Sequence, residues 1–363
     1  MELSALRILG LVAGVGVVAY TIWRRRELRN ADVLILLATA LALLVVASTG
    51  VLNAVLDFLA FKEGGGQRIL GMAVFAIIVL LALVLRALTA IGRMQRGLGA
   101  VVEGLAWEDF RLDGHPDRFR GKVAMVIPAY NEGESLGEVL SRLPEEVCGV
   151  PTAALVVDDG SRDNTSDVAR RHGATVARHV VNRGQGASLR AGYRLASESD
   201  AKVVVTLDAD GQHLPEEMSR LVQPVLDGEV DVAHGSRVLG SSFKNELARE
   251  LGSVVFNRLV STLSGVKMTD CSNGYRAVRA EILPELVFRQ EQYHTAEFLL
   301  EAIKRGYSFK EVPITVVGRL HGTSRKPANL RYGFGFGFAI VRTWLRAGAS
   351  VERPAITAGP AAR

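Results

Sequence analysis

Hydrophobic residues follow two different patterns along this chain of 363 residues. In its first part they form three long apolar runs, over residues 5–23, 33–52 and 69–88. Each run is close to the roughly 20 residues that a helix needs to cross the hydrocarbon core of a bilayer. We therefore expect residues 1–96 to form an all-α transmembrane region. Helices buried in the core of a soluble domain are the alternative, which runs of this length disfavour.

Basic residues near the ends of these runs set the expected orientation. They follow the first and the third run: Arg24, Arg25, Arg26, Arg29, Arg93 and Arg96. Cytosolic connections of membrane proteins carry the excess of Arg and Lys. We therefore expect the amino terminus outside and the rest of the chain after the third run in the cytosol, as in a multi-pass protein of a prokaryotic plasma membrane. A cleaved signal peptide is disfavoured, because the first arginine cluster follows the apolar run and no small-residue cleavage site is evident.

From residue 123 the pattern changes to short apolar strands that alternate with helical segments. Strands are expected over residues 123–127, 153–157, 175–177 and 203–207, and helices over residues 135–143, 165–171 and 186–197. Strands that alternate with helices in this way form a mostly parallel sheet that helices cover. The fold class that we predict is therefore α/β, preceded by the all-α membrane region.

The other segments complete the expected domain organisation. Residues 97–122 are turn-rich and predict a juxtamembrane linker, which leaves residues 123–325 for the α/β domain. Residues 326–350 contain an apolar run too short to span a bilayer and bordered by arginines, which predicts an amphipathic interfacial segment. A buried core helix is the alternative there. Residues 351–363 form a tail that we expect to be disordered.

Composition agrees with a membrane protein and limits its partners. Hydrophobic residues make up 48% of the chain, the mean hydropathy is +0.20 and the net charge is +5. A modest positive charge suits a surface of anionic lipid, and no nucleic-acid partner is predicted. The two cysteines, Cys148 and Cys271, lie far apart without metal-ligand spacing, so reduced thiols in the cytosol fit better than a disulfide.

Polar side chains follow three of the predicted strands, at the point where each strand ends. They are Tyr130, Glu132, Asp158, Asp159, Asp208 and Asp210, and Pro128 lies beside the first of them. The carboxyl ends of parallel strands share one edge of a sheet, where α/β proteins bind nucleotides. Two acids one residue apart can hold one hard cation, Mg²⁺ or Mn²⁺, which would neutralise a diphosphate. An ordinary Asp-x-Asp-Gly turn in a solvated loop is the alternative.

An ordered set of motifs extends over residues 123–325. It comprises VIPAYNE at 126–132, VVDDGS at 156–161, NRGQG at 182–186, LDADGQHLP at 207–215, GSR at 235–237 and EVPI at 311–314. With these motifs the chain resembles the family 2 glycosyltransferases, which have the Rossmann-like GT-A fold. The most similar branch is that of the dolichyl- or polyprenyl-phosphate sugar synthases, such as dolichyl-phosphate mannosyltransferase. The first 100 residues look like the small three-span domains found beside or fused to such enzymes.

The resemblance implies roles in binding the nucleotide-sugar donor. Base and ribose would be held by Pro128, Tyr130, Glu132, Asp158 and Asp159, and the diphosphate by the Gly186 loop and the Asp208 turn. Asp208, Asp210 and Gln212 match the positions that bind the metal, Mg²⁺ or Mn²⁺. Backbone N–H groups at Gly184 and Gly186 would approach phosphate before a helix start. One position departs from the family, which usually has Lys where this chain has Gln185.

Other positions match the acceptor side. Four residues resemble those that grip the phosphate of the lipid acceptor: Arg237, Arg249, Ser253 and Arg319. Arginine suits this task because its fork matches phosphate oxygens and stays charged; ordinary surface arginines are the alternative. Asp270 matches a family acid that would orient the acceptor or act as a base, and with Asp210 and Arg237 it completes the expected catalytic group.

The expected function is that of a membrane-bound, inverting glycosyltransferase. It would move a sugar from a GDP- or UDP-sugar to a polyprenyl or dolichyl phosphate on the cytosolic leaflet. A processive polysaccharide synthase is one alternative, but we find neither its Gln-x-x-Arg-Trp motif nor pore-forming helices after the domain. An inactive membrane scaffold is another, and the intact acid pair argues against it. The sugar, the base, the prenyl length and whether the protein forms a homo-oligomer are left open.

Overall fold

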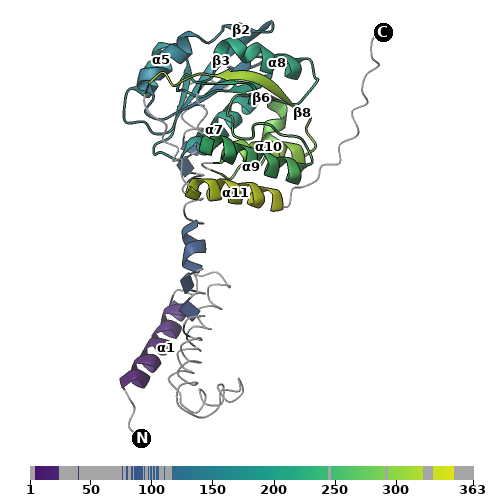
Figure 1. Cartoon of the computed structure of the whole chain (residues 1–363). Helices are drawn as coiled ribbons and strands as arrows, with labels where there is room; N and C mark the ends of the chain where they lie inside the picture. The colour runs from purple at the N-terminus through teal and green to yellow at the C-terminus, as the bar shows by residue number, and fades with distance from the viewer. Residues whose placement is uncertain are drawn as a thin grey trace. The chain divides into compact units, whose positions relative to one another are not determined.

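The structure is a computed structural model of the whole chain (Figure 1). It describes residues 5–23, 40, 76, 79–80, 83–84, 86–92, 94, 97, 99, 101–102, 104–105, 110, 117–243, 247–290, 293–321 and 330–346. The chain divides into two compact units, Met1–Arg96 and Gly97–Arg363, which we describe one at a time.

The first unit contains the helix α1, Ala5–Trp23, so the helix expected over the first apolar run is confirmed. The second run, over residues 33–52, lies outside the described residues apart from position 40, and the third is described only in part. Among all the described residues, no helix combines the length and the apolar character that crossing a membrane requires.

In the part of the second unit that the structure describes, one mixed sheet has eight strands. They are β1 Val123–Ala129, β2 Glu146–Val147, β3 Val150–Asp158, β4 Thr175–Arg178, β5 Val203–Thr206, β6 Val232–Ser242, β7 Arg276–Arg279 and β8 Phe309–Val316. The order is β2-β3-β1-β5-β7-β6-β8, and β4 pairs with β3. Strands β4, β3, β1 and β5 are parallel neighbours, as are β6 and β8. Of the eight described strands, only β7, between β5 and β6, and the short β2 pair antiparallel, so the expected mostly parallel sheet is confirmed.

Helices cover both faces of this sheet. On one face pack α5 Gly133–Ser141, α6 Thr165–Arg171 and α8 Met218–Leu226. On the other pack α7 Gln185–Glu198, α9 Leu247–Ser264, α10 His294–Lys304 and α11 Leu330–Leu345. The unit also contains two short 3₁₀ turns, η1 Pro215–Glu217 and η2 Ala280–Glu285. Figure 1 shows α9, α10 and α11 gathered on one side of the sheet and α8 on the opposite side.

Strand β1 shows how the sequence produces two cores. All seven of its residues are buried, and their side chains alternate between the faces because strand side chains have a period of two. Val123, Met125 and Ile127 join the core under α5, α6 and α8. Ala124 and Val126 join the core under α7, α9, α10 and α11. Full burial of one such aliphatic side chain contributes roughly 1.5–3 kcal/mol to the free energy of folding. This continuous apolar run therefore stabilises β1 as a central strand of the sheet.

Helix α11 falls within the segment for which we expected an interfacial helix, with a buried helix as the alternative. It has a buried side, where Phe336, Ala339 and Ile340 pack into the core with the ring of Phe336 on that of Phe256 in α9. Its other side exposes large apolar residues: Phe334 by 78%, Phe338 by 68% and Leu345 by 76%. The helix is therefore both a core element and the carrier of an exposed apolar face. The tail expected over residues 351–363 lies outside the described residues.

Candidate functional site

The sheet brings the predicted polar groups to one edge. Strands β1, β3 and β5 run in parallel, so the residues that follow Ala129, Asp158 and Thr206 lie next to one another. Strands β6 and β8 run in the same direction; Arg237 lies within β6, where its pairing with β8 becomes irregular after Ser236, and Arg319 follows the end of β8. The antiparallel β7 begins at this edge, because Arg276 pairs with Thr206. Six strands therefore contribute to a single region.

The loop after β1 is attached to the loop after β3. The backbone N–H of Asn131 donates to Ser161 Oγ at 2.9 Å, and the backbone N–H of Arg162 donates to Asn131 Oδ1 at 2.8 Å. The next N–H, of Glu132, donates to Thr165 Oγ1 at 3.0 Å. Asn131 has a φ of 51°, a left-handed conformation that Asn tolerates better than most residues. These contacts fix the backbone of the half-buried Tyr130 and Glu132, while Pro128 is buried inside β1.

The two acids that end β3 are buried and already have protein partners. Asp158 accepts from the backbone N–H of Ser161 at 2.8 Å and from Ser166 Oγ. Asp159 accepts from the backbone N–H of Gly184 at 2.6 Å and also contacts His179 Nδ1 at 2.8 Å. Both side chains thus shape the loops around the site. Their direct contact with a nucleotide stays a prediction.

Asp159 also sets the start of α7. Gly184, at the N-cap, has a φ of 92°, which a residue with a Cβ rarely adopts. The helix begins at Gln185, whose side chain contacts Asp208, so the N-terminus of α7 with Gly186 lies close to the acid pair. A helix start of this kind, close to the acid pair, suits a phosphate group.

The acid pair lies where the end of β5 meets α7 and the segment after β8. Asp208 Oδ1 accepts from Gln185 Nε2 at 2.8 Å. Asp210 Oδ1 accepts from the backbone N–H of Gln212 at 3.0 Å, and its Oδ2 lies 2.8 Å from Arg319 Nη2. Burial and the charge of Asp208 raise the pKa of Asp210 to about 6, against the opposing effect of Arg319. The site therefore disfavours the state in which both carboxylates are ionised.

These groups fit a hard divalent cation. Carboxylate oxygens are the ligands that Mg²⁺ and Mn²⁺ prefer, and a cation would relieve the crowding of charge that raises the pKa of Asp210. The amide nitrogen of Gln212 donates to the carbonyl oxygen of Val317 at 3.3 Å, so its amide oxygen is the atom available to a metal. Next to Asp208 lies Gly274, where a Cβ would come within 3.5 Å of Oδ1.

A buried histidine, which sequence reasoning left without a role in the site, supports Asp208. Nδ1 of His213 accepts from the backbone N–H of Asp208 at 3.1 Å, and Nε2 lies 3.0 Å from Asn273 Oδ1. These partners assign a neutral ring with the proton on Nε2. Asn273 in turn donates to the carbonyl oxygen of Gly235 at 2.7 Å. No local pattern links residues this far apart in the sequence.

A second residue that the sequence did not single out is Arg276. Its side chain is fully buried, and its guanidinium carbon lies 4.6 Å from the ring centre of Phe298. Its Nη2 donates to the carbonyl oxygen of Asn273 at 3.2 Å. Burial lowers the pKa of Arg276, which the negative charge of Asp208 opposes. A positive charge therefore lies behind the acid pair.

The segment after β8 is joined to the acid turn along its backbone. The N–H of Val317 donates to the carbonyl oxygen of Gln212 at 3.0 Å, and that of Leu320 donates to the carbonyl oxygen of Asp210 at 3.1 Å. Gly211 makes this possible, because its φ is 76° and a Cβ there would collide with the Leu320 side chain. The segment places Arg319 beside Asp210 and 3.8 Å from Glu132. Arg319, expected at the acceptor phosphate, thus contacts the acid pair.

Arg237 and Asp270 form a two-pronged ion pair. Arg237 Nε lies 2.7 Å from Asp270 Oδ2, and Nη2 lies 2.8 Å from Oδ1. Burial alone would raise the pKa of Asp270, but the hydrogen bonds and charge of Arg237 lower it below its ordinary value. Arg249 and Ser253 lie four residues apart on α9, hence on one side of it. Ser253 is half-buried, and the side chain of Arg249 lies outside the described part.

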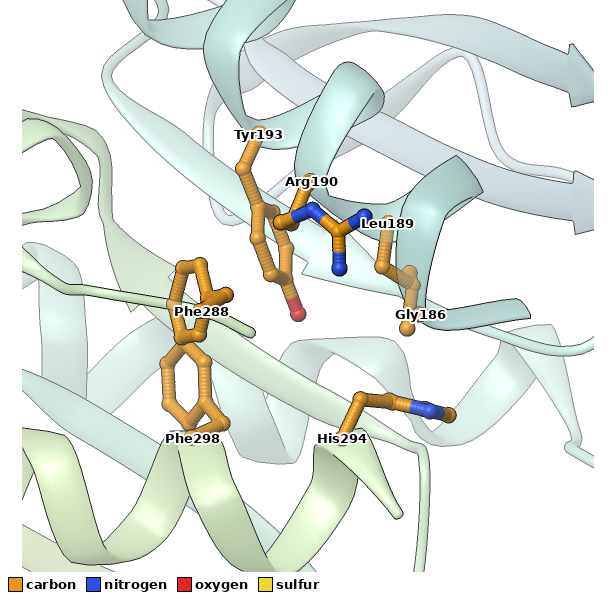
Figure 2. A pocket seen from close by; sticks show the side chains of 7 residues that line it. All are labelled: Gly186, Leu189, Arg190, Tyr193, Phe288, His294 and Phe298. Carbon is orange, nitrogen blue, oxygen red and sulfur yellow. The ribbon is translucent and has the colours of Figure 1, made fainter. Parts of the chain in front are cut away.

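A small cavity opens where α7 faces α10 (Figure 2). Its lining residues are Gly186, Leu189, Arg190, Tyr193, Phe288, His294 and Phe298. Its volume of about 10 Å³ is room for a single water molecule. Figure 2 shows the Phe288 and Phe298 rings next to each other on one side of it and Gly186 on another. It is too small for a sugar, so a donor would bind at the edge of the sheet described above.

Comparisons with known proteins agree with this architecture. Residues 124–287 match the model of the family described as glycosyl transferase family 2. The chain is 36% identical over 219 residues to the polyprenol monophosphomannose synthase of Mycolicibacterium smegmatis. This match covers 56% of this chain and 80% of that protein. It is 29% identical over 234 residues to the UDP-N-acetylglucosamine–dolichyl-phosphate N-acetylglucosaminyltransferase of Methanococcus voltae. This second match covers 58% of this chain and 92% of that protein.

One solved structure is similar in fold. It is that of glucosyl-3-phosphoglycerate synthase from Mycobacterium tuberculosis in complex with Mn²⁺, uridine diphosphate and phosphoglyceric acid. The TM-score is 0.50 at 21% identity, and the match covers 66% of this chain and 83% of that one. At this identity the likeness concerns the fold.

Proposed function

The chain belongs to glycosyltransferase family 2 and is a glycosyltransferase, and on this premise we propose that it transfers a sugar from a nucleotide-sugar to a polyprenyl or dolichyl phosphate. The observation that carries the proposal is the meeting of the acid pair with two arginines at one edge of the sheet. Asp208 and Asp210 suit a cation and a diphosphate, and Arg237 and Arg319 suit a second phosphate. The names of two relatives agree with a lipid phosphate as the acceptor.

The donor would bind along the ends of β1, β3 and β5. Tyr130 offers a ring for stacking against the base, and the start of α7 at Gly186 offers backbone N–H groups to the diphosphate. Asp208, Asp210 and Gln212 would hold Mg²⁺ or Mn²⁺. When bound, such a cation neutralises the diphosphate and makes it a better leaving group. Gln185 orients the Asp208 carboxylate, and His213 holds the backbone N–H of the same residue.

The acceptor phosphate would bind between Arg237 and Arg319, with Ser253 and Arg249 supplied from α9. One of its oxygens attacks the anomeric carbon, a new carbon–oxygen bond forms, and the bond to the nucleoside diphosphate breaks on the opposite face, which inverts the configuration. A phosphate is already ionised at neutral pH, so the step requires no strong general base. The task of the arginines is to orient the nucleophile.

We place the reaction at the cytosolic face of a membrane. The exposed apolar side of α11, with Phe334, Phe338 and Leu345, supports contact with lipid, and Arg342 on the same helix is exposed toward solvent. A surface of this kind suits an interfacial helix. The apolar runs in residues 1–96 would keep the enzyme beside an acceptor that stays in the bilayer, which raises the effective concentration.

Transfer of radiolabel into lipid tests the proposal. The full chain is incubated with vesicles that contain polyprenyl phosphate and with a panel of labelled UDP- and GDP-sugars, and the product is extracted into organic solvent. We expect label in the organic phase with at least one donor, and its loss with EDTA. Asp210→Asn should lower transfer at least 100-fold, whereas Asp167→Asn, which changes an exposed acid on α6, should have no effect. Label that stays in water with every donor refutes the proposal.

A further inference from the structure

We infer that Asp270 and Glu311 are positioning residues that hold Arg237 in the orientation needed for the acceptor phosphate, and that Asp270 is not the catalytic base. The inference rests on the proposed function, because it assigns the way in which one residue of that site is oriented. It gives a role to Glu311, the first residue of the EVPI motif, for which sequence reasoning assigned none.

The first observation is how completely Arg237 is held. Its backbone N–H donates to Asp270 Oδ2 at 3.1 Å, in addition to the two side-chain bonds to the same carboxylate. Its Nη2 also donates to Ser272 Oγ at 2.6 Å. Nε and Nη2 are thus both used, while the side chain keeps an exposed fraction of 32%. A planar guanidinium held along one edge presents its remaining N–H groups in a fixed direction, which suits recognition of a phosphate.

The second observation is that Asp270 lacks the features of a base. Its side chain is 1% exposed, and each oxygen has a donor: Oδ2 from Arg237, and Oδ1 from both Arg237 and Ser272 Oγ, the latter at 3.2 Å. A general base must lie within hydrogen-bond reach of the proton that it removes. The charge of Arg237 further lowers the pKa of Asp270, so it binds a proton weakly. This carboxylate can orient Arg237 but is poorly placed to accept a proton from a substrate.

The third observation is that Glu311 fixes the backbone beneath Asp270. Its Oε1 accepts from the N–H of Asp270 at 2.9 Å, and its Oε2 accepts from the N–H of Thr269 at 2.8 Å. Glu311 belongs to β8 and pairs in register with His234 of β6, the strand that continues to Arg237. Nε2 of His234 donates to the carbonyl oxygen of Asp270 at 2.7 Å. Both ends of the ion pair are therefore attached to the same two strands.

Helix α9 holds this segment from the other side. Oδ1 of Asn257 accepts from the backbone N–H of Cys271 at 2.8 Å, and Ser261 Oγ accepts from that of Met268 at 2.9 Å. Arg249, Ser253, Asn257 and Ser261 follow one another at intervals of four residues and so lie along one side of α9. The side of α9 that supports Asp270 is therefore also the side on which the acceptor residues Arg249 and Ser253 were expected.

Three variants of the full chain test the inference: Glu311→Gln, Asp270→Asn and Ser272→Ala. KM for polyprenyl phosphate in vesicles, KM for the donor and kcat are measured from pH 6 to 9. We expect Glu311→Gln to raise the acceptor KM about tenfold, the equivalent of about one charge-assisted hydrogen bond, and to leave the donor KM unchanged. Glu229→Gln, which changes an exposed acid paired with Lys310 of β8, is the matched control and should match the wild type.

The other variants separate positioning from proton transfer. Asp270→Asn should raise the acceptor KM while kcat stays within about tenfold of the wild type and keeps its pH profile. Loss of a general base would lower kcat by about 100- to 10,000-fold and change that profile. Ser272→Ala, a small change that should fold normally, should raise the acceptor KM about threefold, since it removes one bond to Nη2 of Arg237.

The outcomes distinguish this inference from the proposed function. If the wild type transfers no sugar to polyprenyl phosphate, the proposed function fails, and the inference falls with it. If the wild type is active but Glu311→Gln and Ser272→Ala leave the acceptor KM unchanged, the positioning role alone is overturned. A collapse of kcat and a changed pH profile in Asp270→Asn would likewise overturn it and make Asp270 the base. Melting curves and donor binding confirm that each variant is folded.

Discussion

Replacing Gln185 by lysine should weaken binding of the divalent cation. Gln185 Nε2 lies 2.8 Å from Asp208 Oδ1, so the new ammonium group could reach the carboxylate and compete with a metal. Two unit charges 4 Å apart interact by about 4 kcal/mol at an effective dielectric constant of 20. The side chain of Asp208 is 26% exposed, and solvent screening reduces the effect to about 1–2 kcal/mol. The dissociation constant of the cation should therefore rise about five- to thirtyfold.

Electron paramagnetic resonance of free Mn²⁺, with the full chain and nucleoside diphosphate present, measures this affinity without relying on turnover. The metal dependence of transfer gives a second measure. Gln185→Met is the matched control, because it removes the hydrogen bond to Asp208 without adding a charge, and it should change the affinity less than threefold. Our reasoning fails if Gln185→Lys binds Mn²⁺ as tightly as the wild type, or if both variants weaken binding equally.

Three further predictions concern stability and the membrane face. Gly211→Ala should lower the free energy of unfolding by about 1–3 kcal/mol in denaturant titrations, because its φ is 76° and Leu320 blocks a Cβ. Burial, with the charge of Arg276, lowers the pKa of His234 to about 4. In the unfolded chain this histidine is protonated below about pH 6.5, whereas in the folded protein it stays neutral down to about pH 4. The free energy of unfolding should therefore fall by ~1.4 kcal/mol for each pH unit between these two values, and this fall should be absent in His234→Gln. Phe338→Glu, on the exposed side of α11, should reduce transfer to a long-chain acceptor in vesicles about tenfold but spare a short, water-soluble one.

The sheet and its polar edge could be predicted from the sequence because the signals are local. The apolar run of β1 and the pair of acids after β5 are each recognisable within a few residues, and parallel pairing of the strands then brings their ends together. Helix α7 was expected over residues 186–197 and extends over Gln185–Glu198. The antiparallel β7 was not foreseen, since its four residues carry no pattern that distinguishes them from a parallel strand.

Supporting contacts could not be predicted, because they join residues that are distant in sequence. His213 reaches Asn273, and Glu311 reaches Thr269, only once β7 and β8 have joined the sheet. The acids Asp158 and Asp159 show a different limit. A turn rich in Asp looks the same whether its carboxylates face a ligand or, as here, accept from nearby backbone N–H groups. The local sequence cannot distinguish these two uses.

The backbone bonds between the acid turn and the segment after β8 have a consequence for biosynthesis. A ribosome makes Asp210 long before it makes Arg319 and Leu320, and the acid turn obtains these partners only when β8 has been added. The nascent protein should therefore bind donor poorly until residues 317–320 have been made. Donor binding would, in this way, begin only after β8 and the segment that follows it have joined the sheet.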